Sequence, residues 1–335
     1  MDEGNPIWTT LDLDADGKQI GTLQVPHSVT RSAYGMIPIP IAVIRNGAGP
    51  TLLAMAGCHG DEWEGQIALA RLIRNLEPDH LSGRMILLPS ANSPACQAAT
   101  RESPIDGVNL NRCFPGQATG TPTRQIAHYI ASVLMPLADV FVDLHSGGAS
   151  LDYLPCTFTC LTGEPGFDRR ALDALDAFGG DLAFAQSGTE STGFAGTSAV
   201  SALRHGTVFV SGEFGGSGRI DPQGVAFAER GLRRLACHLG LLKGPAPAPD
   251  APLRMLDMDD PRLFTFAPAA GVFEPAVRLG DTVAAGQAAG WLHNVEDPAA
   301  APRELRFAAA GLVMAIRATA HALRGDCLVH LARDA

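Results

Sequence analysis

The chain has 335 residues, which is long enough for roughly two domains and a well-buried core. It is 46% hydrophobic and 18% charged, with 37 glycines and 24 prolines, a composition that excludes disordered, collagen-like and coiled-coil proteins. The formal net charge is -10 and no long basic stretch is present, so nucleic acid is not an expected partner.

The sequence also bears on location and on partners. No apolar run reaches the roughly 20 residues needed to span a bilayer, and the acidic start differs from a signal peptide, which is basic and then apolar. We therefore expect no membrane partner and a cytoplasmic location. The seven cysteines are scattered and odd in number, which favours free thiols over a disulfide framework. No pattern fixes the oligomeric state, and a homo-oligomer is compatible with the sequence.

Strands and helices are expected to alternate along residues 1–243. Strands are predicted at 36–44, 51–56, 85–88, 140–144 and 207–211, and helices at 64–76, 122–137, 171–178 and 226–242. A long loop is expected from residue 89 to residue 121. This alternation predicts an α/β fold, a mostly parallel mixed sheet with helices on both faces.

The proline-rich segment 244–252 is the expected linker between a first domain at 1–243 and a small all-β domain at 253–335. Short strands predominate beyond it, and a faint repeat suggests two related halves. Ala269-Ala-Gly-Val272 recurs as Ala309-Ala-Gly-Leu312, and Gly280-Asp281 recurs as Gly325-Asp326.

The stretch LGDTVAAGQAAG within this second region resembles the barrel-sandwich domains of lipoyl and biotinyl carriers. Such carriers attach their prosthetic group to a lysine, and no lysine follows Lys243. We therefore expect a barrel-sandwich-like domain that serves as a lid or an interface rather than as a carrier.

The sharpest chemical signal is the segment GCHGDEWEG at 57–65, between a predicted buried strand and a predicted helix. Turns of this kind open into the crevice at the carboxyl ends of parallel strands, where ligands bind. His59 and Glu62 are three residues apart and can converge on one point. They would supply two of the three ligands of a catalytic zinc site. Asp61 and Glu64 compete for the carboxylate role, but the spacing favours Glu62.

A third ligand is expected at the end of another strand, where the segment DLHSGG contains His145. Three protein ligands leave a fourth position open for water, which is typical of catalytic zinc sites. Zinc lowers the pKa of a bound water to about 7. Another divalent ion is also compatible with these ligands, because affinity order alone does not decide which metal is bound.

Further candidates lie near these ligands in the predicted fold. Glu213 follows the strand at 207–211 and could act as a general base and acid in amide hydrolysis. The long loop contains Arg101, Asn111 and Arg112. Guanidinium groups bind carboxylates and stabilise oxyanions, and a neighbouring amide can share the carboxylate.

The motifs HGDEWEG, NLNR, DLHSGG and GEFGG, in this order over about residues 30–240, resemble the succinylglutamate desuccinylase/aspartoacylase family, relatives of the zinc carboxypeptidases. The resemblance implies one zinc ion per chain, held by His59, Glu62 and His145, with Glu213 as general base and acid. It also implies that Arg112 and Asn111 hold the carboxylate of the substrate and that Arg101 polarises the scissile carbonyl.

The activity implied by this resemblance is zinc-dependent hydrolysis of a small N-acyl amino acid. The stretches HGDEWEGQIAL, RESPIDGVNLNRCFPG and DLHSGG look closest to those of members that act on Nα-acetyl-L-2,4-diaminobutyrate in ectoine breakdown. Deacylation of another acylamino acid, a metallocarboxypeptidase and a non-catalytic zinc-dependent binding protein remain as alternatives.

Overall fold

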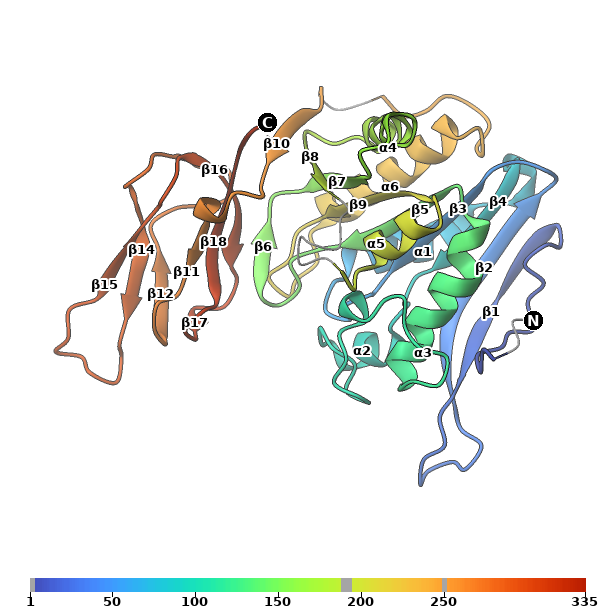
Figure 1. The fold of residues 1–335 in the computed structure, drawn as a ribbon, viewed down its shortest axis with the longest axis horizontal. Coiled ribbons are helices and arrows are strands. Elements are labelled where there is room, and N and C mark those ends of the chain that lie inside the picture. Colours follow the sequence, from blue (N-terminus) through green and yellow to red (C-terminus); the bar gives the residue numbers. More distant parts are fainter. Residues whose placement is uncertain (1–3, 188–194, 249–251) are drawn as a thin grey trace.

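One large mixed sheet forms the centre of the computed structural model, which describes residues 4–187, 195–248 and 252–335 (Figure 1). In these ranges the large sheet has 14 strands, and a second sheet has four. No helix within the described ranges is long and apolar enough to cross a membrane.

The strands of the large sheet follow one another in space in an order that differs from their order along the chain. Its path is β1 (Gly17–Pro26), β2 (Met36–Asn46), β4 (Gly83–Leu88), β3 (Thr51–Ala56), β5 (Val140–His145), β9 (Val208–Glu213), β7 (Cys156–Leu161), β8 (Leu182–Ser187), β10 (Arg254–Asp257), β18 (Cys327–Asp334), β16 (Gly311–Arg317) and β13 (Thr282–Val283). Off this path, β11 (Phe264–Phe266) pairs with β18, and β6 (Leu151–Tyr153) pairs with β16. The smaller sheet consists of β15 (Arg303–Arg306), β14 (Ala288–His293), β12 (Gly271–Pro275) and β17 (His321–Ala322).

Helices pack on both faces of the first part of the large sheet (Figure 1). One face carries α1 (Glu64–Asn75), α4 (Pro165–Phe178) and α6 (Pro222–His238), and the other carries α3 (Pro122–Tyr129) and α5 (Ser198–Arg204). The short α2 (Ser93–Ala98) follows β4. Shorter helical turns occur at Pro78–His80, Leu110–Arg112, Ile130–Leu134, Met135–Leu137 and Pro261–Leu263.

Strand β3 shows why the sheet needs cover on both faces. All six of its residues are buried, and successive side chains point to opposite faces. Leu52 and Ala54 pack in the cluster that contains α1 and α6, whereas Leu53 and Met55 pack in the cluster that contains α3. The predicted mixed α/β fold is confirmed. Its centre, β4-β3-β5-β9, is parallel.

Several elements differ from the expected ones. The predicted loop at 89–121 contains α2, and β7 and β8 lie where no strand was predicted. Helices α4 and α6 begin several residues earlier than the apolar periodicity indicates, since each has a proline in its first turn. At α6 the Asp221 side chain also accepts a hydrogen bond from the Gln223 amide at 2.9 Å, which caps the helix.

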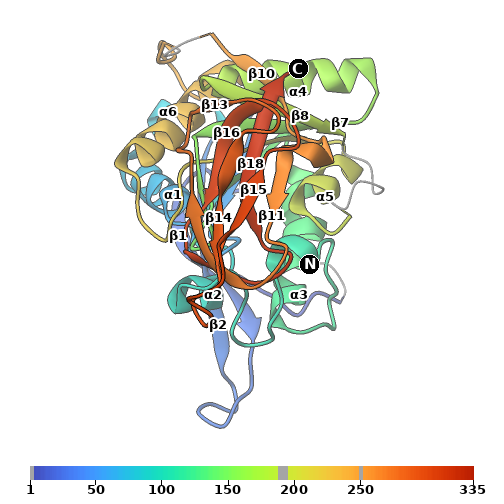
Figure 2. The same cartoon turned by 90° about the vertical axis from the view of Figure 1, so that its left-hand side faces the viewer.

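The large sheet continues across the expected linker at 244–252. Strand β10 lies beyond that segment and pairs in parallel with β8 and antiparallel with β18. The strands of the first part of the large sheet and the C-terminal strands are thus joined by backbone hydrogen bonds. Figure 2 views the molecule from the C-terminal side, with β16 and β18 in front of the helices of the first part.

The repeated Gly-Asp pair builds the same turn twice in the C-terminal region. The carboxylate of Asp281 accepts a hydrogen bond from the Arg278 amide at 2.8 Å, and that of Asp326 accepts one from the Leu323 amide at 2.8 Å. The glycine before each aspartate has a positive φ, as a turn of this kind requires. The sequence repeat therefore corresponds to a repeated local structure.

His330 on β18 is buried where the C-terminal strands meet the segment after β10. Its Nε2 lies 3.2 Å from the Met258 carbonyl oxygen, and its ring stacks on Phe264 with centroids 3.8 Å apart. Burial lowers the pKa of His330 to about 4, only partly offset by the hydrogen bond to Met258. The imidazole is therefore neutral in the folded protein at neutral pH.

Replacement of His330 by Gln should reduce the loss of stability on acidification. The unfolded chain protonates this histidine near pH 6.5 and the folded chain only near pH 4, so the free energy of unfolding falls as the pH decreases through that window. Between pH 7 and pH 4.5 the side chain should account for about 2 kcal/mol of this fall. Urea denaturation at both pH values measures it, with exposed His80→Gln as control. Equal acid sensitivity of the parent and His330→Gln would contradict the expectation.

Candidate active site and metal centre

The candidate site lies where three parallel strands end at one edge of the sheet. His59 and Glu62 follow β3, His145 is the last residue of β5, and Glu213 is the last residue of β9. His145 and Glu213 are direct partners in the parallel register of β5 and β9. The carboxyl ends of neighbouring parallel strands thus bring residues 59, 62, 145 and 213 together.

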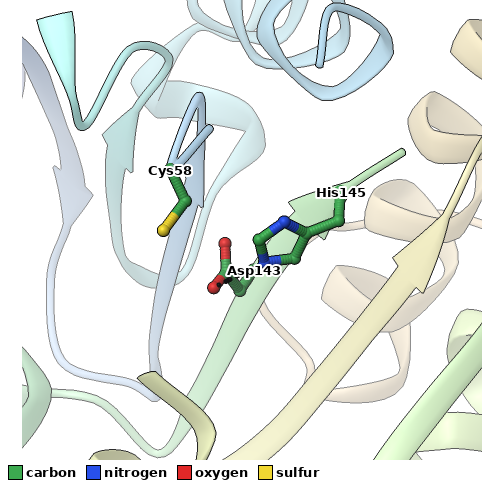
Figure 3. A group of neighbouring side chains, drawn as sticks. All are labelled: Cys58, Asp143 and His145. Atoms are coloured by element: carbon green, nitrogen blue, oxygen red, sulfur yellow. Dashed lines mark ion pairs between the residues drawn. The ribbon is translucent and has the colours of Figure 1, made fainter. Parts of the chain in front are cut away.

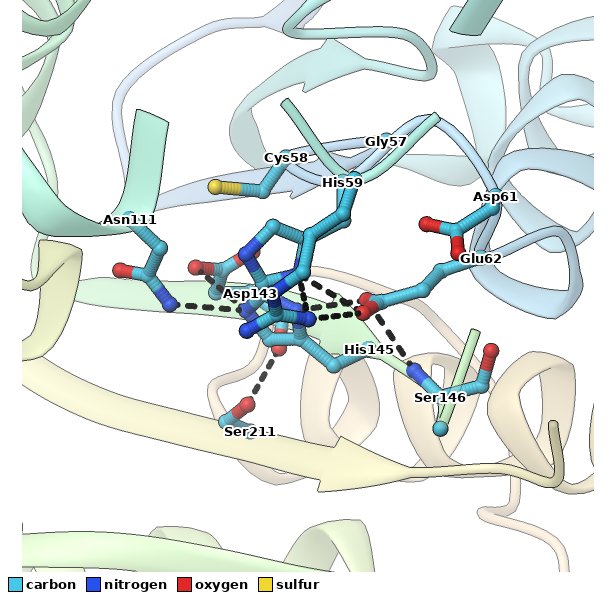
Figure 4. A network of polar contacts seen from close by, with 12 residues as sticks. Gly57, Cys58, His59, Asp61, Glu62, Asn111, Asp143, His145, Ser146 and Ser211 are labelled. Carbon is cyan, nitrogen blue, oxygen red and sulfur yellow. Dashed lines mark hydrogen bonds and ion pairs between the residues drawn. The ribbon is translucent and has the colours of Figure 1, made fainter. Parts of the chain in front are cut away.

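His59, Glu62 and His145 form a compact buried cluster (Figure 4). One carboxylate oxygen of Glu62 lies 2.7 Å from His59 Nδ1, and the other lies 2.8 Å from His145 Nδ1. The two imidazole rings have centroids 5.1 Å apart. The potential ligand atoms of the three residues all lie within 4.8 Å of one another, so a single cation can be reached by all three.

Glycines allow the segment after β3 to approach β5 closely. A Cβ at Gly65 would lie 2.5 Å from the Leu144 Cβ, so a larger residue would push the start of α1 away from β5. Gly57 has a φ of +67°, which favours glycine, and turns the chain at the end of β3. This close approach sets Glu62 against His145.

The electrostatics of the cluster favour an ionised carboxylate. Burial by itself raises the pKa of Glu62, but the neighbouring His59 and His145 hold it well below its usual range. Burial also opposes protonation of His145, whereas Asp143 and Glu62 raise its pKa well above the usual value. A buried carboxylate that stays charged and faces two imidazoles has the chemistry that a divalent cation requires of its ligands.

Outer partners orient both imidazoles. Asp143 Oδ2 lies 3.0 Å from His145 Nε2 and accepts a hydrogen bond from the Ser198 hydroxyl at 2.6 Å. Asn109 Oδ1 lies 3.2 Å from His59 Nε2. Since the Nε2 atoms are engaged in this way, the Nδ1 atoms are the ones presented to a metal. Sequence reasoning missed the roles of Asp143 and Asn109. Asp143 could have been found, because it stands two residues before His145 on the same face of β5.

The two other carboxylates that the sequence offered as metal ligands in place of Glu62 lie outside the cluster. Asp61 accepts a hydrogen bond from the Ala149 amide at 2.8 Å, and Glu64 accepts one from the Asp221 amide at 2.9 Å. Both therefore fix neighbouring loops, and neither belongs to the cluster with the two histidines.

A second group of potential ligands, Cys58, Asp143 and His145, shares one histidine with the first (Figure 3). Burial, followed by Asp143 and Glu62, raises the pKa of the Cys58 thiol well above its usual value. A thiol that stays protonated is a poor metal ligand. Because Asp143 is already bonded to His145 and Ser198, this group supports the first cluster rather than offering a second metal site.

Glu213 is a buried carboxyl beside the cluster. Burial, followed by the negative charge of Glu62, raises its pKa to about 8, against the effect of His145 and Arg101. Its Oε2 atom has no hydrogen-bond partner within the described part of the chain. A carboxyl whose pKa is near neutrality, and which has a free oxygen, is suited to accept and release a proton.

All seven predicted site residues line one cavity of about 860 Å³. A guanidinium nitrogen of Arg101 lies 3.4 Å from Glu62 Oε1 and 3.3 Å from His59 Nδ1. No carboxylate of the described ranges forms an ion pair with Arg112, whose pKa is lowered by burial and by Arg101. The cavity therefore presents two cationic side chains beside the cluster.

The Asn111 side chain is bonded to protein groups. Its Nδ2 lies 3.3 Å from His145 Nε2, and its Oδ1 accepts a hydrogen bond from the Ser198 amide at 2.9 Å. Its backbone carbonyl also accepts a hydrogen bond from the Arg112 guanidinium at 2.7 Å. Because His145 Nε2 donates its hydrogen to Asp143, it does not also accept one from Asn111 Nδ2, so the hydrogen bonds of Asn111 link the start of α5 and Arg112. Other lining residues that the sequence did not single out are Tyr153, Phe158, Phe184, Gln186, Met258, Asp259, Phe264 and His330.

Comparison with known proteins relates the whole chain to one group of hydrolases. The N-alpha-acetyl-L-2,4-diaminobutyric acid deacetylase of Halomonas elongata is 39% identical, with 98% of this chain and 95% of that protein aligned. The crystal structure of a succinylglutamate desuccinylase/aspartoacylase from Rhodobacter sphaeroides has a TM-score of 0.93 and 37% identity, covering 99% of this chain and 100% of the other. The product-bound ectoine utilization protein EutE (DoeB) from Ruegeria pomeroyi has a TM-score of 0.93 and 36% identity, with coverages of 98% and 99%.

The family model matches residues 48–239, which contain His59, Glu62, His145 and Glu213. Together with the relatives that align over nearly the full chain, this match shows that the protein belongs to the succinylglutamate desuccinylase/aspartoacylase family.

Proposed function

We propose that this protein is a zinc-dependent deacetylase that hydrolyses Nα-acetyl-L-2,4-diaminobutyrate to 2,4-diaminobutyrate and acetate. The observation that carries the proposal is the buried His59, Glu62 and His145 cluster beside the free carboxyl oxygen of Glu213 in one cavity. The substrate is suggested by the relative from Halomonas elongata, which is a deacetylase for this compound by name.

Zinc fits the donor set of the cluster. Two imidazole nitrogens and one carboxylate are the ligands of a common class of catalytic zinc sites. The charge of Glu62 is buried, and a divalent cation would compensate it more fully than the two imidazoles do. When bound, zinc would act as a Lewis acid on the acyl oxygen and lower the pKa of the attacking water.

Glu213 is the proposed general base and acid. Its carboxylate would take a proton from the attacking water as the new carbon–oxygen bond forms. It would then give this proton to the nitrogen as the carbon–nitrogen bond breaks, so that the amine leaves neutral. The partnerless Oε2 atom is available for both transfers.

The two arginines are proposed to orient the substrate. Arg112 carries no protein carboxylate among the described residues and would bind the α-carboxylate of the substrate, with Asn111 holding its guanidinium through the 2.7 Å hydrogen bond. Arg101 points towards the cluster and would stabilise the negative charge that develops on the acyl oxygen. Asn111 is also the proposed second contact of the α-carboxylate.

Glu213→Gln should leave the metal content unchanged and lower kcat by roughly 10²–10⁴, because the amide cannot accept the proton of the attacking water. Acetate release from the proposed substrate and elemental analysis of the same preparation measure the two effects. Turnover at the parent rate would contradict the role of Glu213.

Asp143→Asn should weaken metal binding by roughly 10–100-fold, because the neutral amide no longer supports the His145 imidazole as a charged acceptor. Metal retained at increasing chelator concentration is the measurement. Asp173→Asn on the exposed surface of α4 removes a carboxylate far from the site and serves as control. Equal retention in the parent and Asp143→Asn would show that Asp143 does not stabilise the metal centre.

Arg112→Gln should raise KM by roughly 10–100-fold with a smaller change in kcat, since a charged hydrogen bond to the substrate is lost. N-acetyl-1,3-diaminopropane lacks the α-carboxylate, so the parent and the variant should hydrolyse it at similar rates. Exposed Arg31→Gln is the matched charge control. A KM for the proposed substrate that does not change would contradict this assignment.

A further inference from the structure

The cavity extends beyond the metal cluster onto the C-terminal part of the chain. Met258 and Asp259, which follow β10, line it together with Phe264 of β11 and His330 of β18. The family model covers residues 48–239, so this wall lies outside the matched catalytic segment. Any substrate group that reaches this side of the cavity meets residues specific to the C-terminal region.

Asp259 differs from its two acidic neighbours in its partners. Asp257 pairs with Arg333 and Asp260 pairs with Arg262, each at 2.7 Å. No cationic side chain in the described ranges pairs with Asp259, whose carboxylate accepts only a neutral hydrogen bond from the Gln186 side chain. Asp259 is an exposed residue of the cavity wall, and no protein cation of the described ranges competes for its carboxylate.

The other two carboxylates of the cavity already have roles. Among the described residues that line it, only Glu62, Glu213 and Asp259 carry a carboxyl group. Glu62 lies between two imidazoles, and Glu213 is the proposed proton-transfer group. Among the described lining residues, Asp259 is therefore the carboxylate that remains for a cationic group of the substrate.

The wall around Asp259 suits a short apolar chain that ends in a positive charge. Phe158 and Phe184 are stacked with centroids 4.8 Å apart and line the cavity together with Met258. Methylene groups can pack against these side chains. His330 is neutral at neutral pH and donates to the Met258 carbonyl, so it fixes the backbone next to Asp259 without adding a competing positive charge.

We infer that Asp259 is the specificity-determining residue that binds the side-chain ammonium of an N-acyl diamino acid. Arg112 and Asp259 would then hold the carboxylate and the ammonium of the same substrate, one from each part of the chain. This assignment rests on the proposed function and adds to it the group that distinguishes a diamino acid from a neutral one.

The test compares Nα-acetyl-L-2,4-diaminobutyrate with Nα-acetyl-L-norvaline, in which a methyl group replaces the ammonium. Asp259→Asn should lower kcat/KM for the diamino substrate by about 10–100-fold, the value of a charged hydrogen bond. For the norvaline substrate, kcat/KM should change by less than about 3-fold. This substrate has no side-chain ammonium, so it loses no contact when Asp259 becomes neutral. Asp334→Asn, on the exposed end of β18 and paired with Arg254, is the control and should change neither value.

A second variant keeps the charge and moves it. Asp259→Glu extends the carboxylate by one methylene. The substrate preference of this variant should therefore shift towards Nα-acetyl-L-2,3-diaminopropionate, whose ammonium lies one carbon closer to the α-carbon. A purely structural role of Asp259 would not produce this shift in preference between chain lengths.

The outcomes separate this inference from the proposed function. A zinc-loaded parent that hydrolyses neither N-acetyl amino acid would overturn the proposed function itself. A parent that hydrolyses both substrates equally well, or an Asp259→Asn variant that loses activity on both to the same extent, would overturn only the assignment of Asp259.

Discussion

The structure depends on one buried ion-pair arrangement, the Glu62 carboxylate held between the Nδ1 atoms of His59 and His145. Burying a carboxylate without compensation costs several kcal/mol, so the surrounding structure must keep its partners in place. Parallel strands β3 and β5 bring the three residues to one edge of the sheet, and Gly65 lets α1 begin close to β5. The same burial raises the pKa of Glu213 and leaves it without a hydrogen-bond partner for one oxygen among the described residues. The groups proposed for metal binding and for proton transfer therefore share one water-poor environment.

The proximity of His59, Glu62, His145 and Glu213 could be predicted because the sequence patterns that indicate it are local. His59, His145 and Glu213 each follow an apolar run that reads as a buried strand, and strands that alternate with helices pair in parallel with their carboxyl ends at one edge. The helical spacing of Glu62 from His59 also depends only on neighbouring residues. The sequence spacing alone does not explain why Asp61 and Glu64 lie outside the cluster. Asp61 binds the loop at Ala149, Glu64 binds the loop at Asp221, and both contacts depend on distant parts of the chain.

Features that depend on distant contacts could not be predicted in this way. Strand β7, with the sequence CTFTCL, alternates apolar and polar residues over its first five positions and could have been predicted from that pattern, whereas β8, with the sequence LAFAQS, shows no such alternation. Helix α2 has only six residues, two of them alanine, and a helix of this length is too short for a helical period to show in the sequence. Asp259 reaches the cavity because β10 pairs with β8 and β18, and no local pattern around residue 259 encodes those pairings.

Strand β18 is the last strand along the chain, and it contributes to the wall of the cavity. It pairs with β10, β11 and β16, and its His330 forms part of the cavity wall. The histidines and Glu62 lie on β5 and on the turn after β3, far from this strand along the chain. The cavity around them, however, has His330 of β18 in its wall. A chain that ended before β18 would thus lack one wall of the cavity that surrounds the cluster.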